Sequence, residues 1–206
     1  MTVEPDEIAC YLRMGRRAPA EGQDAMPPDG ALAERIAALI DEASAICRPA
    51  RIWRRFALAD NAVVSGGVRL DMGGTLGRHI EGCKSVFLSC GTIGAGFDAF
   101  QRRIAVTSAA DALIVQAIGA ALIEKTMDAM EDEIRAELAD DETLLSRYSP
   151  GYGDFPLAAQ RTILALLDTP RRIGVSLTDT LLMVPSKSVS AVIGVRCATR
   201  TSTTPS

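Results

Sequence analysis

Apolar residues recur at two different periods along this 206-residue chain, and each period predicts a different kind of element. Spacing of three and four residues indicates amphipathic helices. We expect such helices at 4–17, 29–48, 97–104, 109–138 and 157–167. Alternation, or a short apolar run between turn residues, indicates strands. We expect strands within 51–58, 62–70 and 85–94, and two or three more within 173–195.

The order of these elements predicts the fold class. Helices and strands arrive in clusters rather than in strict alternation, which favours an α+β fold with a mixed, largely antiparallel sheet and flanking helices. Residues 18–28 are rich in Pro, Gly and Ala and are expected to form a loop or linker. We therefore divide the chain into an N-terminal helical segment (1–50), a core (51–197) and a Thr- and Ser-rich tail expected to be disordered (198–206).

Two local details follow from the same patterns. Asp154 is a plausible N-terminal cap for the helix at 157–167, because a short acidic side chain can accept a hydrogen bond from the first helical turn. The far end of the long helix, 130–137, reads Met-Glu-Asp-Glu-Ile-Arg-Ala-Glu and is expected to be solvated because it is rich in charge.

The charge and hydropathy of the chain exclude several function classes. The net charge is −4 and the pI about 5.1, and the basic residues are scattered, so no surface that neutralises nucleic-acid phosphates is expected. The first residues are acidic where a signal peptide is basic, and no apolar run approaches the roughly 18 residues of a membrane span. We predict a cytoplasmic protein that binds neither nucleic acid nor membrane.

Cysteine and histidine usage limits the chemistry further. The five cysteines are an odd number, widely spread and without a CxxC pair, which favours reduced, structural thiols over disulfides or a zinc site. As an alternative, Cys83 and Cys90 could be redox-active or reach a cofactor. His79 is the only histidine, and its Gly-Arg-His-Ile context favours a turn or surface role. We predict no metal site.

One short segment, 147–152, combines a fixed cation, a rigid turn and an aromatic ring in the sequence Arg-Tyr-Ser-Pro-Gly-Tyr. A guanidinium can bind a carboxylate in a bidentate fork, and an aromatic ring attracts a sulfonium cation. Pro150 fixes the backbone, and Gly151 lets main-chain groups approach a ligand without a Cβ in the way. The segment suits a small zwitterion such as S-adenosylmethionine; a purely structural turn is the alternative.

Four blocks of sequence carry a resemblance to a known family. Segment 147–156, Arg-Tyr-Ser-Pro-Gly-Tyr-Gly-Asp-Phe-Pro, resembles the Arg-x-x-x-Gly-Tyr ligand loop of the activation domain of cobalamin-dependent methionine synthase. Downstream, Leu-Thr-Asp-Thr at 177–180 and Pro-Ser-Lys-Ser-Val-Ser at 185–190 follow in the family's order and spacing. Upstream, 113–124 is similar to the family's long helix. The likeness spans about 85–195, in the form of the short, stand-alone members.

The resemblance implies a set of ligand-binding residues. Arg147 is expected to hold the carboxylate of S-adenosylmethionine, and Glu124 to contact its amino group, a ribose hydroxyl or its sulfonium. The adenosyl or amino-acid part is expected to lie against Tyr152 and the backbone of Ser149, Pro150 and Gly151. For Glu124 the structural alternative is a helix-face carboxylate paired with Lys125 or another nearby charge.

The resemblance also implies a function. In the family a cob(II) corrinoid is reduced by one electron and trapped by methyl transfer from S-adenosylmethionine. Here the cobalamin would be held by a partner, a cobalamin-binding protein or a truncated methionine synthase, and a flavodoxin-type protein or another donor would supply the electron. The reduced corrinoid is a strong nucleophile, so alignment suffices and no catalytic residue is expected.

Two alternatives remain open at this stage. The family's sheet continues into a His-Pro and aromatic segment that carries a further ligand tyrosine, and this sequence has no such segment after Arg196. The first alternative is therefore a non-catalytic docking or S-adenosylmethionine-sensing module. The second is a Rossmann methyltransferase with Cys-Gly-Thr-Ile-Gly-Ala-Gly at 90–96 as its glycine turn. That turn lies deep in the chain without regular βα alternation, so a structural strand-to-helix turn is favoured.

Overall fold

The computed structural model describes residues 3–14 and 30–197, so the expected linker at 18–28 and tail at 198–206 lie outside the described residues. The helices are α1 (Pro5–Met14), α2 (Gly30–Ile46), α3 (Gly74–His79), α4 (Ala95–Thr107), α5 (Ala109–Ala136), α6 (Ala159–Leu167) and α7 (Thr169–Arg172). The strands are β1 (Ala50–Ala57), β2 (Ala62–Ser65), β3 (Val68–Asp71), β4 (Ser85–Thr92), β5 (Glu142–Leu144), β6 (Ser176–Leu177), β7 (Met183–Val184) and β8 (Ser188–Cys197).

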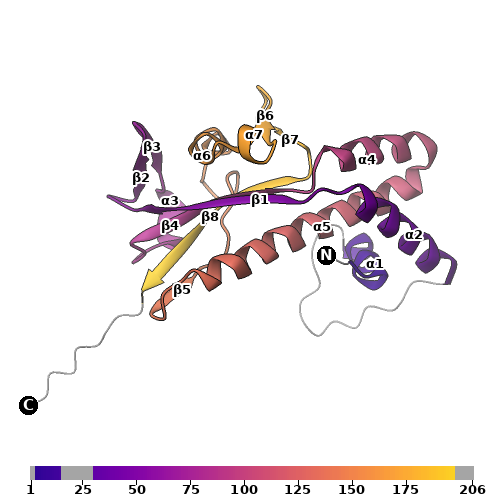
Figure 1. The fold of residues 1–206 in the computed structure, drawn as a ribbon, viewed down its shortest axis with the longest axis horizontal. Coiled ribbons are helices and arrows are strands. Elements are labelled where there is room, and N and C mark those ends of the chain that lie inside the picture. Colours follow the sequence, from indigo (N-terminus) through magenta and orange to yellow (C-terminus); the bar gives the residue numbers. More distant parts are fainter. Residues whose placement is uncertain (1–2, 15–29, 198–206) are drawn as a thin grey trace, which may run out of the picture.

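Four strands form a central sheet in the order β1-β4-β8-β5 (Figure 1), and each neighbouring pair is antiparallel. The hairpins β2-β3 and β6-β7 form two small additional sheets. This arrangement confirms the predicted α+β class with a largely antiparallel sheet. The short strand β5 has no counterpart among the predicted strands, because three residues are too few to show a period.

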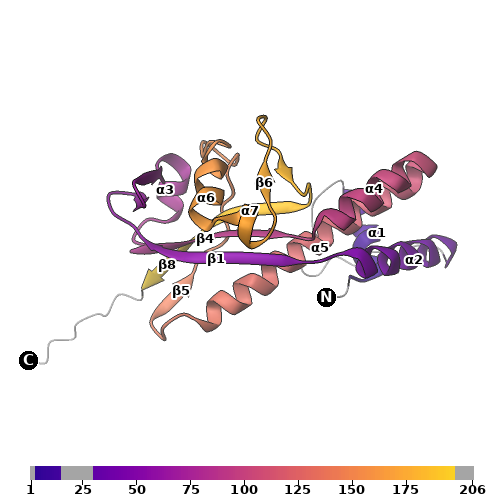
Figure 2. The ribbon, with the colours of Figure 1, turned by 45° about the horizontal axis from the view of Figure 1, so that its top comes forward.

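The two faces of the sheet are covered by different layers. Along β4, Phe87 packs into a core shared with α5, whereas Val86 and Leu88 pack into a core shared with α3 and α6. Successive side chains of β4 point to opposite faces of the sheet, as in a strand that is buried on both faces. Figure 2 shows α5 crossing one face of the sheet, with α3, α6 and α7 on the other. The sheet therefore separates two apolar cores.

The helix α5 is the longest element and lies close to the sheet. Its N-terminus is capped by Ser108, whose Oγ accepts a 3.2 Å hydrogen bond from the Asp111 N–H. Gly91 of β4 lies against this helix, and a Cβ there would lie 2.6 Å from the Met127 Sδ. The prediction that 130–137 is solvated is wrong in part, because Met130, Glu131 and Ile134 are buried. Their helical spacing places them on the face of α5 that packs into the core.

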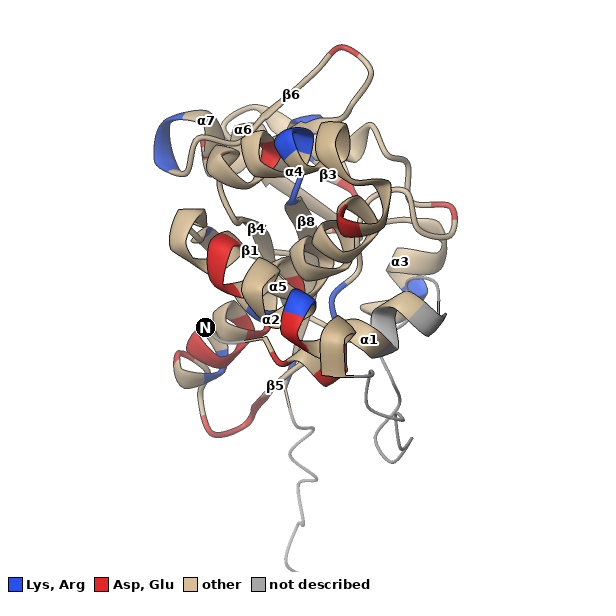
Figure 3. Ribbon diagram, turned by 90° about the vertical axis from the view of Figure 1, so that its right-hand side faces the viewer, with Lys and Arg blue, Asp and Glu red and all other residues tan. Residues whose placement is uncertain are grey.

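The N-terminal helices share the α5 core. Ile8 of α1 and Ile36 and Leu39 of α2 are fully buried in it, and Lys125 of α5 forms a 2.9 Å ion pair with Glu7 of α1. The division of the chain at residue 50 stays a prediction. Among the described residues no helix is long and apolar enough to span a membrane. Figure 3 shows acidic and basic residues interspersed over this helical end of the molecule.

Candidate functional site

The segment 147–156 lies at the edge of the central sheet, beside β8. The strand β5 pairs with the C-terminal end of β8, and the Leu145 N–H donates a 2.9 Å hydrogen bond to the Gly194 carbonyl. Tyr148 then exchanges two 2.9 Å backbone hydrogen bonds with Val192. From Leu145 to Tyr148 the edge advances by three residues, whereas from Gly194 to Val192 its partner β8 advances by two. The edge therefore contains one extra residue.

This extra residue is a β-bulge at Ser146, and it decides where Arg147 points. Leu144 packs into the α5 core and Tyr148 into the α6 core. In a regular strand, residues three apart lie on opposite faces. Because the bulge inserts one residue, Arg147 lies on the same face as Leu144 and meets α5. A bulge thus directs the principal predicted ligand residue toward the long helix.

Arg147 forms ion pairs with three carboxylates of α5. Its Nη2 lies 2.9 Å from the Glu124 Oε2, and its Nη1 lies 2.8 Å from both the Asp128 Oδ1 and the Glu131 Oε1. The structure therefore brings two predicted site residues, Glu124 and Arg147, into contact. Asp128 and Glu131 were missed from sequence, although the spacing 124, 128, 131 places all three on one face of a helix.

The electrostatics of this cluster favour a permanently charged guanidinium. Burial opposes the charge on Arg147, but the hydrogen bond to Asp128 and the attraction of Glu131, Asp128 and Glu124 outweigh it, so the pKa of Arg147 is raised above its ordinary value. Three carboxylates beside one guanidinium also leave an excess of negative charge. Glu124 and Asp128 are 50% and 63% exposed, so this excess faces solvent.

The residues after Arg147 form a tight turn. Gly151 has a φ of +89°, a conformation that favours glycine, and its N–H donates a 2.8 Å hydrogen bond to the Phe155 carbonyl. The Tyr152 N–H donates to the Ser149 carbonyl at 3.2 Å. The Tyr152 side chain is 70% exposed and touches the Tyr148 ring edge-on at 5.4 Å between centroids. An exposed ring thus lies five residues after Arg147 in sequence, against the Tyr148 ring.

The prediction that Asp154 caps the helix at 157–167 is wrong. The cap position of α6 is Ala158, without a side-chain hydrogen bond. Asp154 instead accepts a 2.8 Å hydrogen bond from the Thr75 N–H in the first turn of α3, and hydrogen bonds from Thr75 lower the pKa of its carboxyl group. Thr75 also contacts the Tyr148 hydroxyl at 2.6 Å. The turn is therefore tied to α3 as well as to β8 and α5.

The family profile "Vitamin B12 dependent methionine synthase, activation domain" matches residues 86–201, which is more than half of the chain. The chain belongs to this family. The match contains all of β4 but its first residue, together with α5, β5, the turn at 149–152, α6 and β8. It therefore includes the whole Arg147 cluster. The resemblance that the sequence carries is confirmed.

The likeness to known proteins extends beyond the matched segment. This chain is similar to the solved structure "Crystal Structure of the MetH Reactivation Domain bound to AdoHcy", with a TM-score of 0.56 and 16% sequence identity. The alignment covers 94% of this chain and 77% of that chain. At this identity the likeness concerns the fold, and it takes in the N-terminal region as well. No match was found among the curated proteins.

Cys83, Cys90 and His79 are further side chains that the sequence marks as potentially reactive. Burial raises the pKa of the Cys90 thiol to about 12 and also raises that of Cys83, which disfavours the reactive thiolate at either position. His79 Nε2 lies 3.0 Å from the Ser146 carbonyl oxygen, and its ring packs on Tyr148 at 5.5 Å. Within 3–14 and 30–197, no group of three or more His, Cys, Asp and Glu residues is arranged to hold a metal ion.

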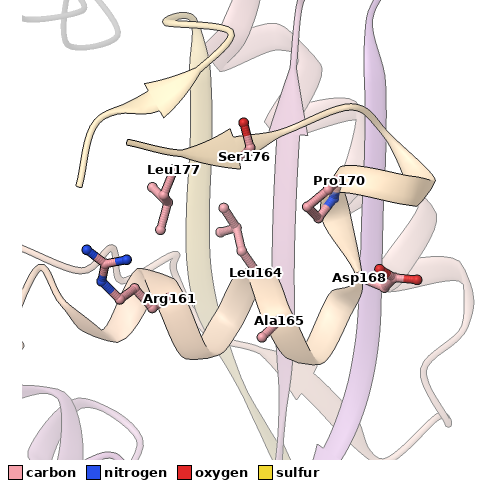
Figure 4. Close-up of a pocket in the computed structure, with 7 residues that line it drawn as sticks. All are labelled: Arg161, Leu164, Ala165, Asp168, Pro170, Ser176 and Leu177. Carbon is pink, nitrogen blue, oxygen red and sulfur yellow. The ribbon is translucent and has the colours of Figure 1, made fainter. Parts of the chain in front are cut away.

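A pocket of about 410 Å³ lies elsewhere on the protein, between α6, α7 and β6 (Figure 4). Leu164 and Leu177 point into it, and Arg161 and Asp168 lie at its two ends. The Arg161 Nη2 donates a 3.0 Å hydrogen bond to the Asp179 carbonyl. None of the six predicted site residues lines this pocket. The candidate ligand site is therefore the exposed edge at Arg147 rather than this pocket.

Proposed function

We propose that this protein binds S-adenosylmethionine at the Arg147 edge and presents its methyl group to a corrinoid held by a partner protein. The observation that carries the proposal is the contact between Arg147 and Glu124, two residues that the family resemblance assigns to the ligand and that 23 residues separate in sequence. Family membership supports the reactivation role, and the similar MetH reactivation domain is described as bound to AdoHcy. AdoHcy is S-adenosylmethionine without its transferable methyl group.

The side chains at this edge match the groups of the proposed ligand. Arg147 offers a fixed cation for the carboxylate. The surplus negative charge of Glu124 and Asp128 suits the ammonium and sulfonium groups, and the exposed ring of Tyr152 offers a face to the adenine or the sulfonium. The turn at 149–151 follows Arg147 closely in sequence and would supply backbone groups to the ligand. No general base is needed, because the reduced corrinoid of the partner supplies the nucleophile.

The proposed role of this chain is alignment. It would hold the donor methyl group at an exposed sheet edge, which a partner of this chain can approach because Tyr152, Glu124 and Asp128 are all at least half exposed. The partner would be a cobalamin-binding protein or a truncated methionine synthase, working with a flavodoxin-type or other electron donor. The placement of the protein in the cytoplasm belongs to this proposal too.

Calorimetric titration of S-adenosylmethionine into the wild-type protein and the Arg147→Ala variant tests the ligand site. We expect saturable binding that the variant loses. A circular dichroism melt of the variant controls for folding, since Arg147 also ties the turn to α5. Absence of binding to the wild-type protein would contradict the proposal.

A second candidate is a docking or sensing module without turnover. The observation that favours it is that three protein carboxylates already occupy Arg147, which leaves fewer donors for a ligand. The two candidates differ in a reconstituted assay with reductant and a cobalamin-binding protein. A methyl donor yields methylcobalamin that depends on Arg147 and Tyr152, whereas a docking module binds the partner equally well without S-adenosylmethionine and forms no methylcobalamin.

A further inference from the structure

The three carboxylates around Arg147 are not equivalent. The Glu131 side chain is 11% exposed, against 50% for Glu124 and 63% for Asp128. Glu131 is itself fixed by Arg135, whose Nη2 donates a 2.7 Å hydrogen bond to the Glu131 Oε2. Solvent and salt weaken a shielded ion pair less than an exposed one. Glu131 is therefore the partner whose ion pair with the guanidinium is least weakened by solvent.

The hydrogen-bond donors of Arg147 are only partly used. A guanidinium has five N–H donors. Nη1 donates a hydrogen bond to Asp128 and forms an ion pair with Glu131 at 2.8 Å, and Nη2 donates a hydrogen bond to Glu124. Among the described residues, the Nε hydrogen and one Nη2 hydrogen therefore have no protein acceptor. Nε and Nη2 are neighbouring nitrogens, and a carboxylate can bind across them in a bidentate fork without displacing Glu131 from Nη1.

We infer that Glu131 is a positioning residue for S-adenosylmethionine: by fixing Nη1 of Arg147, it keeps the Nε and Nη2 edge available to the ligand carboxylate. The inference rests on the proposed function and concerns a side chain that does not touch the ligand. Without Glu131, Arg147 is held only by two exposed carboxylates and has more freedom to turn this edge away. A purely structural role for Glu131, as a tie between α5 and the turn, would instead affect every ligand of the site equally.

The test separates these two roles by changing the ligand as well as the protein. The intact protein is titrated calorimetrically with S-adenosylmethionine and with its decarboxylated analogue, which lacks only the carboxylate. Glu131→Gln removes the charge and preserves the size of the side chain. Asp132→Asn is the matched control, because Asp132 pairs with the same Arg135, at 2.7 Å, but forms no ion pair with Arg147.

We expect Glu131→Gln to weaken S-adenosylmethionine binding about tenfold, because the variant loses the best shielded ion pair of the Arg147 guanidinium. The affinity for the decarboxylated analogue should stay within about twofold, and Asp132→Asn should change neither. Equal losses for the two ligands, or an unchanged affinity for S-adenosylmethionine, would overturn the inference. Should Glu131→Gln fail to fold, Glu131→Asp, which keeps the charge but withdraws the oxygens, should show the same selective loss. If the wild-type protein does not bind S-adenosylmethionine at all, the proposed function itself fails.

Discussion

The carboxylate of Asp154 accepts a 2.8 Å hydrogen bond from the Thr75 N–H, although 79 residues separate the two in sequence. The contact places an acid at the N-terminal end of α3, where unpaired N–H groups and the helix dipole favour negative charge. Gly74 makes room for it, because a Cβ there would lie 2.2 Å from the Asp154 Oδ2. The turn that carries the candidate site is thereby joined to the opposite layer of the fold.

Asp154→Asn is expected to lower the free energy of unfolding in a pH-dependent way. The pKa of Asp154 is lowered in the folded state by its hydrogen bonds with Thr75. Such a group contributes stability that is present above its unfolded pKa, about 3.9, and is lost as the pH falls through the folded value. Denaturant melts of both proteins between pH 7 and pH 2 should show a difference near neutrality that vanishes in acid; a difference independent of pH would contradict this account.

Deletion of Ser146 is expected to leave binding of S-adenosylmethionine largely intact. The deletion removes the extra residue, so Arg147 follows Leu144 by two positions and stays on the α5 face, while Tyr148 can keep its partner Val192. Ser146→Ala is the matched control, because it keeps the bulge and removes only the hydroxyl group. Calorimetry should show near wild-type affinity in both variants. Loss of binding in the deletion alone would show that the ligand needs the bulge itself and not only the face on which Arg147 lies.

Tyr152→Ala is expected to separate ligand binding from stability. Its ring is 70% exposed, so the free energy of unfolding should change by no more than about 0.5 kcal/mol. If the ring contacts the ligand as proposed, the affinity for S-adenosylmethionine should fall about tenfold, in line with about 1–2 kcal/mol for a cation–π contact. Val106→Ala, at an 88% exposed position in the last turn of α4, should change neither quantity.

Gly91→Val is expected to destabilise the fold by about 1–3 kcal/mol, the usual effect of overpacking a core. A Cβ at Gly91 would lie 2.6 Å from the Met127 Sδ, so α5 or the Met127 side chain must move. Gly73→Ala is the control, because a Cβ there meets nothing within 4 Å and its φ is −71°. Urea denaturation of both variants measures the effect, and an unchanged midpoint in Gly91→Val would show that α5 adapts freely.

The sequence by itself determined the types of element and the family. Apolar periods of two and of three to four are local signals, so β4 and α5 were predicted close to their observed bounds, and the blocks at 147–156, 177–180 and 185–190 carried the resemblance that the family profile confirms. The resemblance assigned Glu124 and Arg147 to one ligand, but it did not predict that the two side chains contact each other.

Only the tertiary structure decided how the candidate site is built. The bulge at Ser146 depends on the register between β5 and β8, whose paired residues lie about fifty positions apart, and no local pattern records a register. Asp154 has two possible helices to cap, and only the packing of α3 beside the turn selects Thr75. Glu131 looked like a solvated charge because its neighbours are acidic. It is buried because Arg147, from the segment that follows β5, packs against α5 and neutralises it.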